Sequence, residues 1–245
     1  MTADVQHIGR PNASPVLRAS IAEQIAALRG PDAPAAPPPL LEIAVERVAL
    51  PGGHVLVARP SDWPELRENE AFDKRPTPYW AVPWPSGLSL ARLVASQPPK
   101  GKRVLELGCG LAIPTVAAAR AGAAHVLATD VNTDSIVFAA HNLHLNDVTG
   151  DTAVGDWRQI VETFADEPWD LVLAADVLYT RENVQLLVDV LPGLLAPGGE
   201  VWLADPRRAG AGEFLPIAKK LWHVDSHEDP EDDRVMLHRL HGRRR

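Results

Sequence analysis

The stretch Arg103-Val-Leu-Glu-Leu-Gly-Cys-Gly-Leu-Ala-Ile-Pro-Thr115, followed by His125-Val-Leu-Ala-Thr-Asp130, decides the fold of this chain. Val104, Leu105 and Leu107 form the short apolar run of a central parallel strand that is covered on both faces. Two glycines then allow a sharp turn close to a ligand, and a proline followed by an alanine-rich run predicts a helix. The second stretch predicts the next strand, which ends in a carboxylate. Together they predict a nucleotide-binding unit.

The charged residues of this unit narrow the kind of ligand. Asp130 ends the second strand, where an acidic residue can accept hydrogen bonds from both hydroxyls of a ribose. Glu106 lies two residues before Gly108, and a carboxylate that faces the turn repels phosphates and suits a cationic ligand. Ile113 stands where a dinucleotide-binding unit has its third glycine, so a pyrophosphate lacks a close-packed helix start. A dehydrogenase is therefore the weaker alternative.

Composition excludes several classes of protein. The 245 residues suit one domain with an extension, and the single cysteine rules out a disulfide framework within the chain. No stretch is apolar enough to span a bilayer or to act as a secretory signal, so we expect a cytoplasmic protein without a membrane partner. The formal net charge of −8 argues against a general affinity for nucleic acid.

The N-terminal part of the chain reads as an extension. Ser14 to Gly30 has the apolar spacing of a helix, and Pro31 to Pro39 is a proline- and alanine-rich linker. Leu40 to Leu50 and His54 to Ala58 then predict two strands around Pro51-Gly-Gly53, which form an antiparallel hairpin. We expect residues 1–39 to lie outside a domain that spans residues 40–245.

Strands and helices alternate from Arg103 onward, which predicts an α/β fold with a doubly wound, mostly parallel sheet of seven strands. The last two strands have no helix between them, and the acidic stretch from Glu228 to Asp233 reads as the turn of an antiparallel pair at one side of the sheet. The expected strands are Arg103 to Leu107, His125 to Thr129, Asp151 to Val154, Asp170 to Ala174, Glu200 to Ala204, Trp222 to Asp225 and Val235 to Leu240.

Ligands of a doubly wound sheet bind past the carboxyl ends of its strands. The third strand ends in Gly155-Asp-Trp157, whose indole can lie against an adenine ring or simply fill the core. The fourth strand ends in Ala174-Ala-Asp-Val-Leu-Tyr179, from which Asp176 and Tyr179 are expected to project into the site. Asp176 has an alternative role as the cap of the helix that begins near Glu182.

The pattern Glu106-Leu-Gly-Cys-Gly110 resembles the first motif of the seven-strand (class I) S-adenosylmethionine-dependent methyltransferases. The Asp-x-x-Tyr sequence that ends at Tyr179, the motif with Trp157, and the upstream Pro78-Tyr-Trp-Ala-Val-Pro-Trp-Pro-Ser-Gly87 narrow the resemblance. They are similar to the protein-lysine methyltransferase group that includes the electron-transfer-flavoprotein β-subunit lysine methyltransferases. The resemblance covers roughly Leu40 to the C terminus, and it implies a Rossmann-like fold whose last strand inserts antiparallel between two neighbours.

The resemblance also implies a cofactor and its contacts. The cofactor would be S-adenosylmethionine, with S-adenosylhomocysteine as the product, and Asp176 and Tyr179 would face the acceptor amine. Glu106 joins the cofactor contacts by the charge argument above, and Cys109 is read as a small residue in a tight loop rather than as a nucleophile. Trp80 and Trp84 have the alternative role of packing the hairpin against the sheet. The implied cofactor contacts are Trp84, Gly108, Cys109, Gly110, Asp130, Trp157 and Ala175.

A direct displacement follows, in which the acceptor nitrogen attacks the sulfonium methyl in line and no metal takes part. Asp176 would orient the nitrogen and Tyr179 would supply an oxygen contact. The expected acceptor is a protein with an exposed lysine. Two alternatives stay open: a small amine as the acceptor, and a cofactor-binding interaction protein without catalysis.

Two further polar clusters are expected to be surface features. His223, His227, Glu228 and Asp229 lie away from the cofactor unit, so we read them as solvated surface rather than as a metal site. Pro206-Arg-Arg208 follows the fifth strand and reads as an exposed basic turn, with contact to an acidic substrate surface as the alternative.

Overall fold

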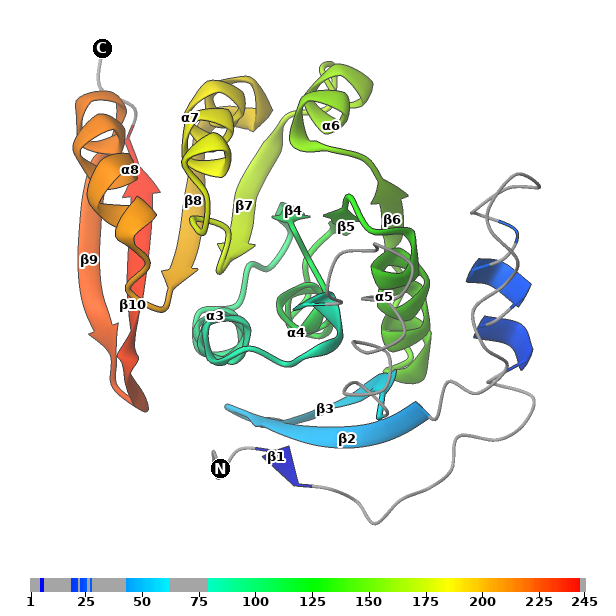
Figure 1. Ribbon diagram of the computed structural model, residues 1–245. Coiled ribbons are helices and arrows are strands. Elements are labelled where there is room, and N and C mark those ends of the chain that lie inside the picture. The colour runs from blue at the N-terminus through cyan, green and yellow to red at the C-terminus, as the bar shows by residue number, and fades with distance from the viewer. Residues whose placement is uncertain are drawn as a thin grey trace.

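The computed structural model describes residues 5–6, 19–21, 23–25, 27, 43–61 and 79–242. Within the expected N-terminal helix, the described residues are helical, and Ile21 and Ile25 are fully buried. The remainder of that helix and the linker from Pro31 to Pro39 lie outside the described residues. Figure 1 shows a large sheet and a small sheet with helices between them.

The large sheet has seven strands in the order β6-β5-β4-β7-β8-β10-β9. The pairs β5–β6, β4–β5, β4–β7 and β7–β8 are parallel, whereas β10 lies antiparallel between β8 and β9. This confirms the expected fold, including the inserted last strand. The strands are β4 (Arg103–Leu107), β5 (His125–Asp130), β6 (Asp151–Val154), β7 (Trp169–Ala175), β8 (Leu195–Asp205), β9 (His223–Asp229) and β10 (Asp232–His241).

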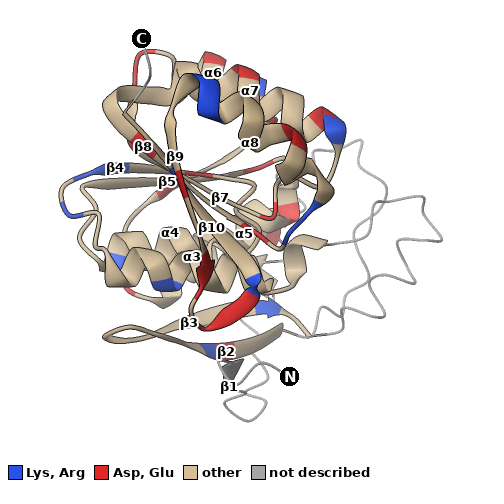
Figure 2. Ribbon diagram, turned by 90° about the vertical axis from the view of Figure 1, so that its left-hand side faces the viewer, with Lys and Arg blue, Asp and Glu red and all other residues tan. Residues whose placement is uncertain are grey.

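Helices cover both faces of this sheet, as a doubly wound fold requires (Figures 1 and 2). One core cluster joins the sheet to the first group of helices, and a second cluster joins it to the other group. The first group is α3 (Pro85–Ser96), α4 (Ile113–Arg120) and α5 (Thr133–Leu145), preceded by the 3-10 turn η1 (Tyr79–Ala81); the second group is α6 (Trp157–Thr163), α7 (Arg181–Leu194) and α8 (Ala209–Leu221).

The small sheet contains β1 (Val5–Gln6), β2 (Ile43–Leu50) and β3 (Gly53–Pro60), all antiparallel, so the expected hairpin is confirmed. It lies under α3, α4 and α5, on the side away from the large sheet (Figure 2). Asn142 of α5 and Asn146, which directly follows α5, hold it there through hydrogen bonds. The Asn142 Oδ1 atom accepts from the backbone N–H of Ala58 at 2.7 Å, and Asn146 Oδ1 accepts from that of Leu56 at 2.8 Å.

The late hairpin differs from the expectation. The stretch expected as an acidic turn contributes to both strands, because β9 continues to Asp229 and β10 begins at Asp232. Asp229 is buried and its carboxylate pairs with Arg92 of α3 at 2.7 Å, so its expected place on a solvated surface is wrong. A buried carboxylate needs such a partner. Trp222 is buried at the end of α8 and does not start the strand.

Two features are absent from the part of the chain that the structure describes. No helix in this part of the chain is long and apolar enough to cross a membrane. No group of three or more His, Cys, Asp or Glu side chains among the same residues is arranged to hold a metal ion.

Candidate active site

The glycine turn after β4 adopts a backbone that favours glycine. Gly108 has φ of 66° and Gly110 has φ of 51°, both in the left-handed region. A Cβ atom at Gly110 would lie 3.2 Å from the carbonyl oxygen of Trp80, so the turn and η1 approach closely. The backbone N–H of Cys109 donates to the carbonyl oxygen of Thr129 at 2.9 Å. The turn is therefore held between β5 and η1.

Asp130 lies beside this turn, as the sequence predicts. Its Oδ2 atom accepts from the backbone N–H of Gly110 at 3.0 Å, and its Oδ1 atom accepts from that of Asn132 at 2.9 Å. Burial raises the pKa of Asp130 above its usual range. Asn132 caps α5 through bonds from Asp134 N and Ser135 N. One carboxylate thus fixes the glycine turn and the start of the next loop together.

Glu106 lies under the turn at the start of α4. Its Oε2 atom accepts hydrogen bonds from the backbone N–H of Thr115, at 2.9 Å, and from the Thr115 hydroxyl. The side chain is buried, and burial raises its pKa to about 8. The structure therefore gives Glu106 a partner within the protein, and its contact with a bound cation stays a prediction.

The side chains around the turn suit a cofactor with cationic groups and no phosphate. The segments 106–115 and 129–135 contain acidic residues but no lysine or arginine. A polyphosphate would meet repelling carboxylates there and no cationic side chain from these two segments. Val131, directly after Asp130, is 72% exposed and offers an apolar surface beside the carboxylate. Sequence reasoning missed Val131, although an apolar residue straight after the strand-ending acid was the available signal.

Cys109 is the central residue of the turn and its thiol is free and buried. Burial raises the pKa of Cys109 well above its ordinary value, and the nearby carboxylates of Asp130 and Glu106 raise it further. A thiolate is therefore disfavoured here. The reading of Cys109 as a small residue in a tight loop agrees with this geometry.

The segment after β7 lies against the glycine turn. The Val177 Cγ1 atom is 3.4 Å from the position that a Cβ would take at Gly108. Ala175 ends β7 opposite Ala204 of β8, and the backbone N–H of Asp176 donates to the Ala204 carbonyl at 2.9 Å. This contact brings the Asp-x-x-Tyr segment to the same edge of the sheet as the turn.

Asp176 forms a two-pronged ion pair with Arg208, which precedes α8. The Arg208 Nε atom lies 2.8 Å from Oδ1 and its Nη2 atom lies 2.9 Å from Oδ2. The alternative role of Asp176 as a helix cap is wrong, because Thr180 caps α7 through a bond from Asn183 N at 3.0 Å. The basic turn is exposed as expected, but both of its arginines are paired; Arg207 binds Glu228 at 2.5 Å.

Asp205, the last residue of β8, is a second carboxylate at this edge and was missed by sequence reasoning. It is 1% exposed, and its Oδ2 atom accepts from the backbone N–H of Arg208 at 2.8 Å. Among the described residues its Oδ1 atom has no hydrogen-bond partner. Burial, together with the charge of Asp176, raises the pKa of Asp205 to about 6.

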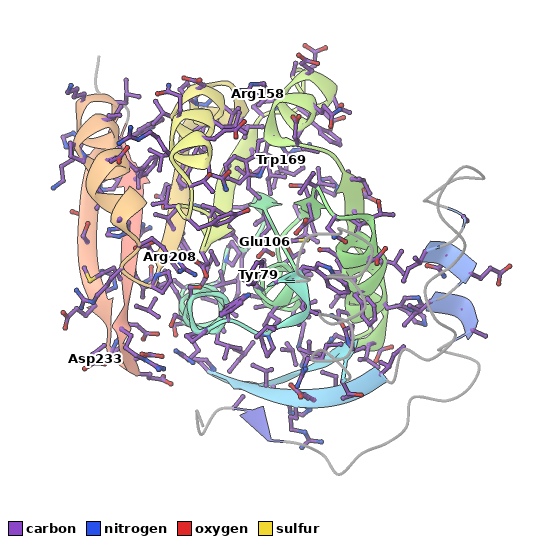
Figure 3. All side chains as sticks on the ribbon, in the orientation of Figure 1. Tyr79, Glu106, Arg158, Trp169, Arg208 and Asp233 are labelled. Atoms are coloured by element: carbon purple, nitrogen blue, oxygen red, sulfur yellow. The ribbon has the colours of Figure 1, made fainter. Side chains whose placement is uncertain are left out.

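Aromatic side chains border the edge from η1 and the start of α3. The Trp84 indole Nε1 donates to the carbonyl oxygen of Tyr79 at 2.7 Å, and the two rings lie 6.3 Å apart. Trp80 instead packs on Phe138 with ring centroids 5.3 Å apart, which agrees with its alternative role in packing. In Figure 3, Arg208 is labelled beside the end of β8 and Tyr79 is labelled next to α4. Tyr79 and Tyr179 are both largely exposed.

Trp157 lies at the carboxyl end of β6, as expected, and begins α6. Asp156 caps this helix and forms a reciprocal pair of bonds with Gln159. The Trp157 side chain is buried and belongs to the same core cluster as Ile160. Its contact with a cofactor therefore stays a prediction, and core packing is the role that its surroundings display.

Sequence comparisons agree with this geometry. A family model described as lysine methyltransferase matches residues 82–220. The chain is 35% identical over 149 residues to an electron transfer flavoprotein beta subunit lysine methyltransferase of Danio rerio, covering 58% of this chain and 55% of that protein. It is 31% identical over 168 residues to EEF1A lysine methyltransferase 3 of Mus musculus, covering 65% and 71%. The chain spans about half the length of the first of these relatives.

Solved structures share the fold. A 16S rRNA N2 G1207 methyltransferase from T. thermophilus, in complex with AdoMet and guanosine, aligns with a TM-score of 0.63 and 17% identity, covering 84% of this chain and 52% of that chain. An N-methyltransferase from Bradyrhizobium japonicum, in complex with S-adenosyl-L-homocysteine, aligns with a TM-score of 0.53 and 21% identity, covering 73% and 97%. These likenesses concern the architecture alone.

Proposed function

The chain belongs to the lysine methyltransferase family, and on this premise we propose that it transfers the methyl group of S-adenosylmethionine to lysine side chains of a protein. The single observation that carries the proposal is the contact between Val177 and the glycine turn at Gly108. It joins the segment with Asp176 and Tyr179 to the turn expected to hold the cofactor. An acceptor amine at Asp176 then lies next to the methyl donor.

The residues of the turn would hold the cofactor. Asp130 would accept from the ribose hydroxyls, Val131 would cover one face of the adenine, and the backbone at Gly108 and Gly110 would allow close approach. Burial raises the pKa of Glu106 to about 8, and a cationic ligand above it would lower that pKa and favour the charged carboxylate. When bound, S-adenosylmethionine supplies an electrophilic methyl group on a sulfonium. The remaining proposed cofactor contacts are Trp84, Cys109, Trp157 and Ala175.

The residues after β7 would hold the acceptor. Asp176 is 11% exposed in its side chain, so it can attract and orient an ammonium group that reaches the edge. Tyr179 is 64% exposed and its hydroxyl can accept or donate a hydrogen bond at the nitrogen. The amine has to release one proton to solvent before its lone pair can accept the methyl group. Holding the two reactants in line is the main contribution of the protein.

The proposed acceptor is a protein rather than a nucleic acid or a membrane component. The relatives named above are lysine methyltransferases of electron transfer flavoprotein beta subunit and of EEF1A. The net charge of −8 opposes general binding to nucleic acid. We also place the protein in the cytoplasm, where its single buried thiol stays reduced.

Transfer of labelled methyl from S-adenosylmethionine tests this function. The acceptors are purified electron transfer flavoprotein beta subunit and a desalted lysate of the source organism, with Asp176→Ala in parallel. Label in a discrete protein band that the variant does not produce, mapped to a lysine by mass spectrometry, supports the proposal. Label that requires the small-molecule fraction makes the protein a metabolite N-methyltransferase instead. Cofactor binding without any transfer indicates an interaction protein.

A further inference from the structure

The ion pair between Arg208 and Asp176 joins two parts of the site. Asp176 follows β7 and Arg208 follows β8, so the pair spans the ends of adjacent parallel strands. The planar guanidinium meets both carboxylate oxygens, at 2.8 and 2.9 Å, which is the fork geometry that arginine forms and lysine does not. Asp176 therefore meets an incoming ammonium as half of a paired unit.

Pairing matters because the acceptor has to lose a proton. A lysine amine has an ordinary pKa of about 10.4, and a lone carboxylate beside it raises that pKa by favouring the ammonium. A carboxylate neutralised by an arginine binds the amine through hydrogen bonds but stabilises its charged form less. The pair can thus orient the nitrogen without holding it in the unreactive state.

Of the charged residues that the structure describes near the carboxyl ends of β7 and β8, Arg208 is the one that neutralises Asp176. The hydrogen bonds to Asp176 raise the pKa of Arg208 above its ordinary value, and the charges of Asp176 and Asp205 and the nearby Tyr79 act in the same direction. Tyr179 is exposed to solvent, and Glu182 on the first turn of α7 is exposed as well. Other arginines near this end of the sheet in the described part of the chain pair with other acids: Arg92 with Asp229, Arg181 with Glu213, Arg207 with Glu228 and Arg234 with Asp232.

We propose that Arg208 is a positioning residue that neutralises Asp176 and thereby lets the bound acceptor amine lose its proton near neutral pH. The proposal rests on the methyl-transfer function proposed above and deepens it. It assigns the pH range of the reaction to a residue outside the Asp-x-x-Tyr segment. The chain carries its own control, because Arg207 is a neighbouring exposed arginine whose partner is Glu228 on β9.

The test is the pH dependence of kcat and KM from pH 6 to 10. The acceptor is electron transfer flavoprotein beta subunit, or the labelled lysate protein where that differs. Arg208→Gln removes the positive charge and keeps the backbone N–H of residue 208, which donates a hydrogen bond to Asp205. Arg208→Lys keeps the charge, and Arg208→Met provides a second neutral variant should the first fail to fold. Arg207→Gln is the matched control. An unchanged cofactor affinity, measured by calorimetry, shows that the glycine turn is intact in each variant.

The neutral variants are expected to move the acidic limb of kcat to higher pH by about one unit, which is about tenfold in kcat at pH 7. Their acceptor KM stays level or falls, and their kcat recovers at high pH. Arg208→Lys and Arg207→Gln keep the native profile. Equal losses at every pH, or an unmoved limb, would overturn this inference alone. Absence of transfer by the native protein overturns the proposed function and this inference with it.

Discussion

The carbonyl oxygen of Trp80 lies 3.2 Å from the position that a Cβ atom would take at Gly110, so η1 closes directly over the glycine turn. Gly110→Ala places a methyl group in this contact and forces a left-handed φ of 51° on an alanine. We expect a loss of about 1–2 kcal/mol in unfolding free energy and at least a tenfold weaker cofactor affinity. Denaturant unfolding and titration calorimetry measure the two effects.

Gly212→Ala is the control for that substitution. Gly212 lies within α8, and a Cβ atom there would meet nothing within 4 Å. Alanine is a better helix former than glycine, so this variant should gain about 0.5–1 kcal/mol of stability with unchanged cofactor affinity. Equal cofactor affinities in the two variants would show that the Trp80 contact does not shape the site.

Asp176→Asn tests the acceptor side of the site. Asparagine tolerates the left-handed φ of 54° at this position and keeps the shape of the side chain, but it loses the negative charge that attracts an ammonium. We expect methyl transfer to fall about 100-fold while cofactor affinity is retained. Asp189→Asn on the exposed face of α7 is the matched control, since Asp189 accepts a hydrogen bond from Gln185 one turn earlier on the same helix. A variant as active as the control would remove Asp176 from the site.

Tyr179→Phe removes one hydroxyl from a side chain that is mostly exposed. Exposure means that the fold gains little from this hydroxyl, so the melting temperature should stay within about 2 °C of the native value. Transfer should fall about tenfold, because the oxygen contact at the acceptor nitrogen is lost. Unchanged initial rates, measured at saturating cofactor, would assign Tyr179 to the surface alone.

Glu106 predicts a pH dependence of stability. Its pKa is about 8 in the folded protein against an ordinary value of 4.5, so between these values the folded state binds more protons than the unfolded state. The free energy of unfolding therefore falls as pH rises from 4.5 to 8, and the full penalty is present above pH 8. At pH 7 the penalty is about 3 kcal/mol.

Glu106→Gln removes this titration and keeps an acceptor for Thr115. The variant should be more stable than the native protein at neutral pH, and the difference should grow from pH 4.5 to 8 and then level off. Asp205 titrates in the same range in both proteins, so its effect cancels in the comparison. If the melting temperatures of the native protein and of Glu106→Gln change with pH in parallel, the pKa of Glu106 is not raised by burial.

Most of the fold could be predicted because hydrophobic periodicity and glycine turns are local signals. The bounds of β4 and β6 agree with the expected strands, and the turn at Gly108 and Gly110 has the left-handed backbone that two glycines indicate. The prediction that the acidic stretch of the late hairpin is an exposed turn was wrong, because Asp229 is neutralised by Arg92, which lies far away in the sequence. The charges of this stretch indicated a turn, whereas the ion pair with Arg92 allows Asp229 to be buried at the end of β9.

The residues of the candidate site that lie within one βα unit could be predicted from the sequence. The contacts between the ends of different strands could not. Asp130 was found from its distance to the glycine turn, because one βα unit carries both. The ion pair of Arg208 with Asp176 and the position of Asp205 beside it were missed, because these residues come together only after β7 and β8 pair. The spacing of residues along the sequence does not reveal which strands are neighbours. The strand order in the folded sheet does, and it brings these residues together.

The insertion of β10 between β8 and β9 has a consequence for how the chain folds during synthesis. β9 leaves the ribosome before β10 but pairs with the sheet only through it, so neither can join β8 until residues 232–241 have emerged. Until then β8 is an open edge strand, and the segment with Asp205 and Arg208 lies at an unfinished border. The half of the sheet that holds the glycine turn can therefore form first, and the acceptor half is completed only when the late hairpin docks.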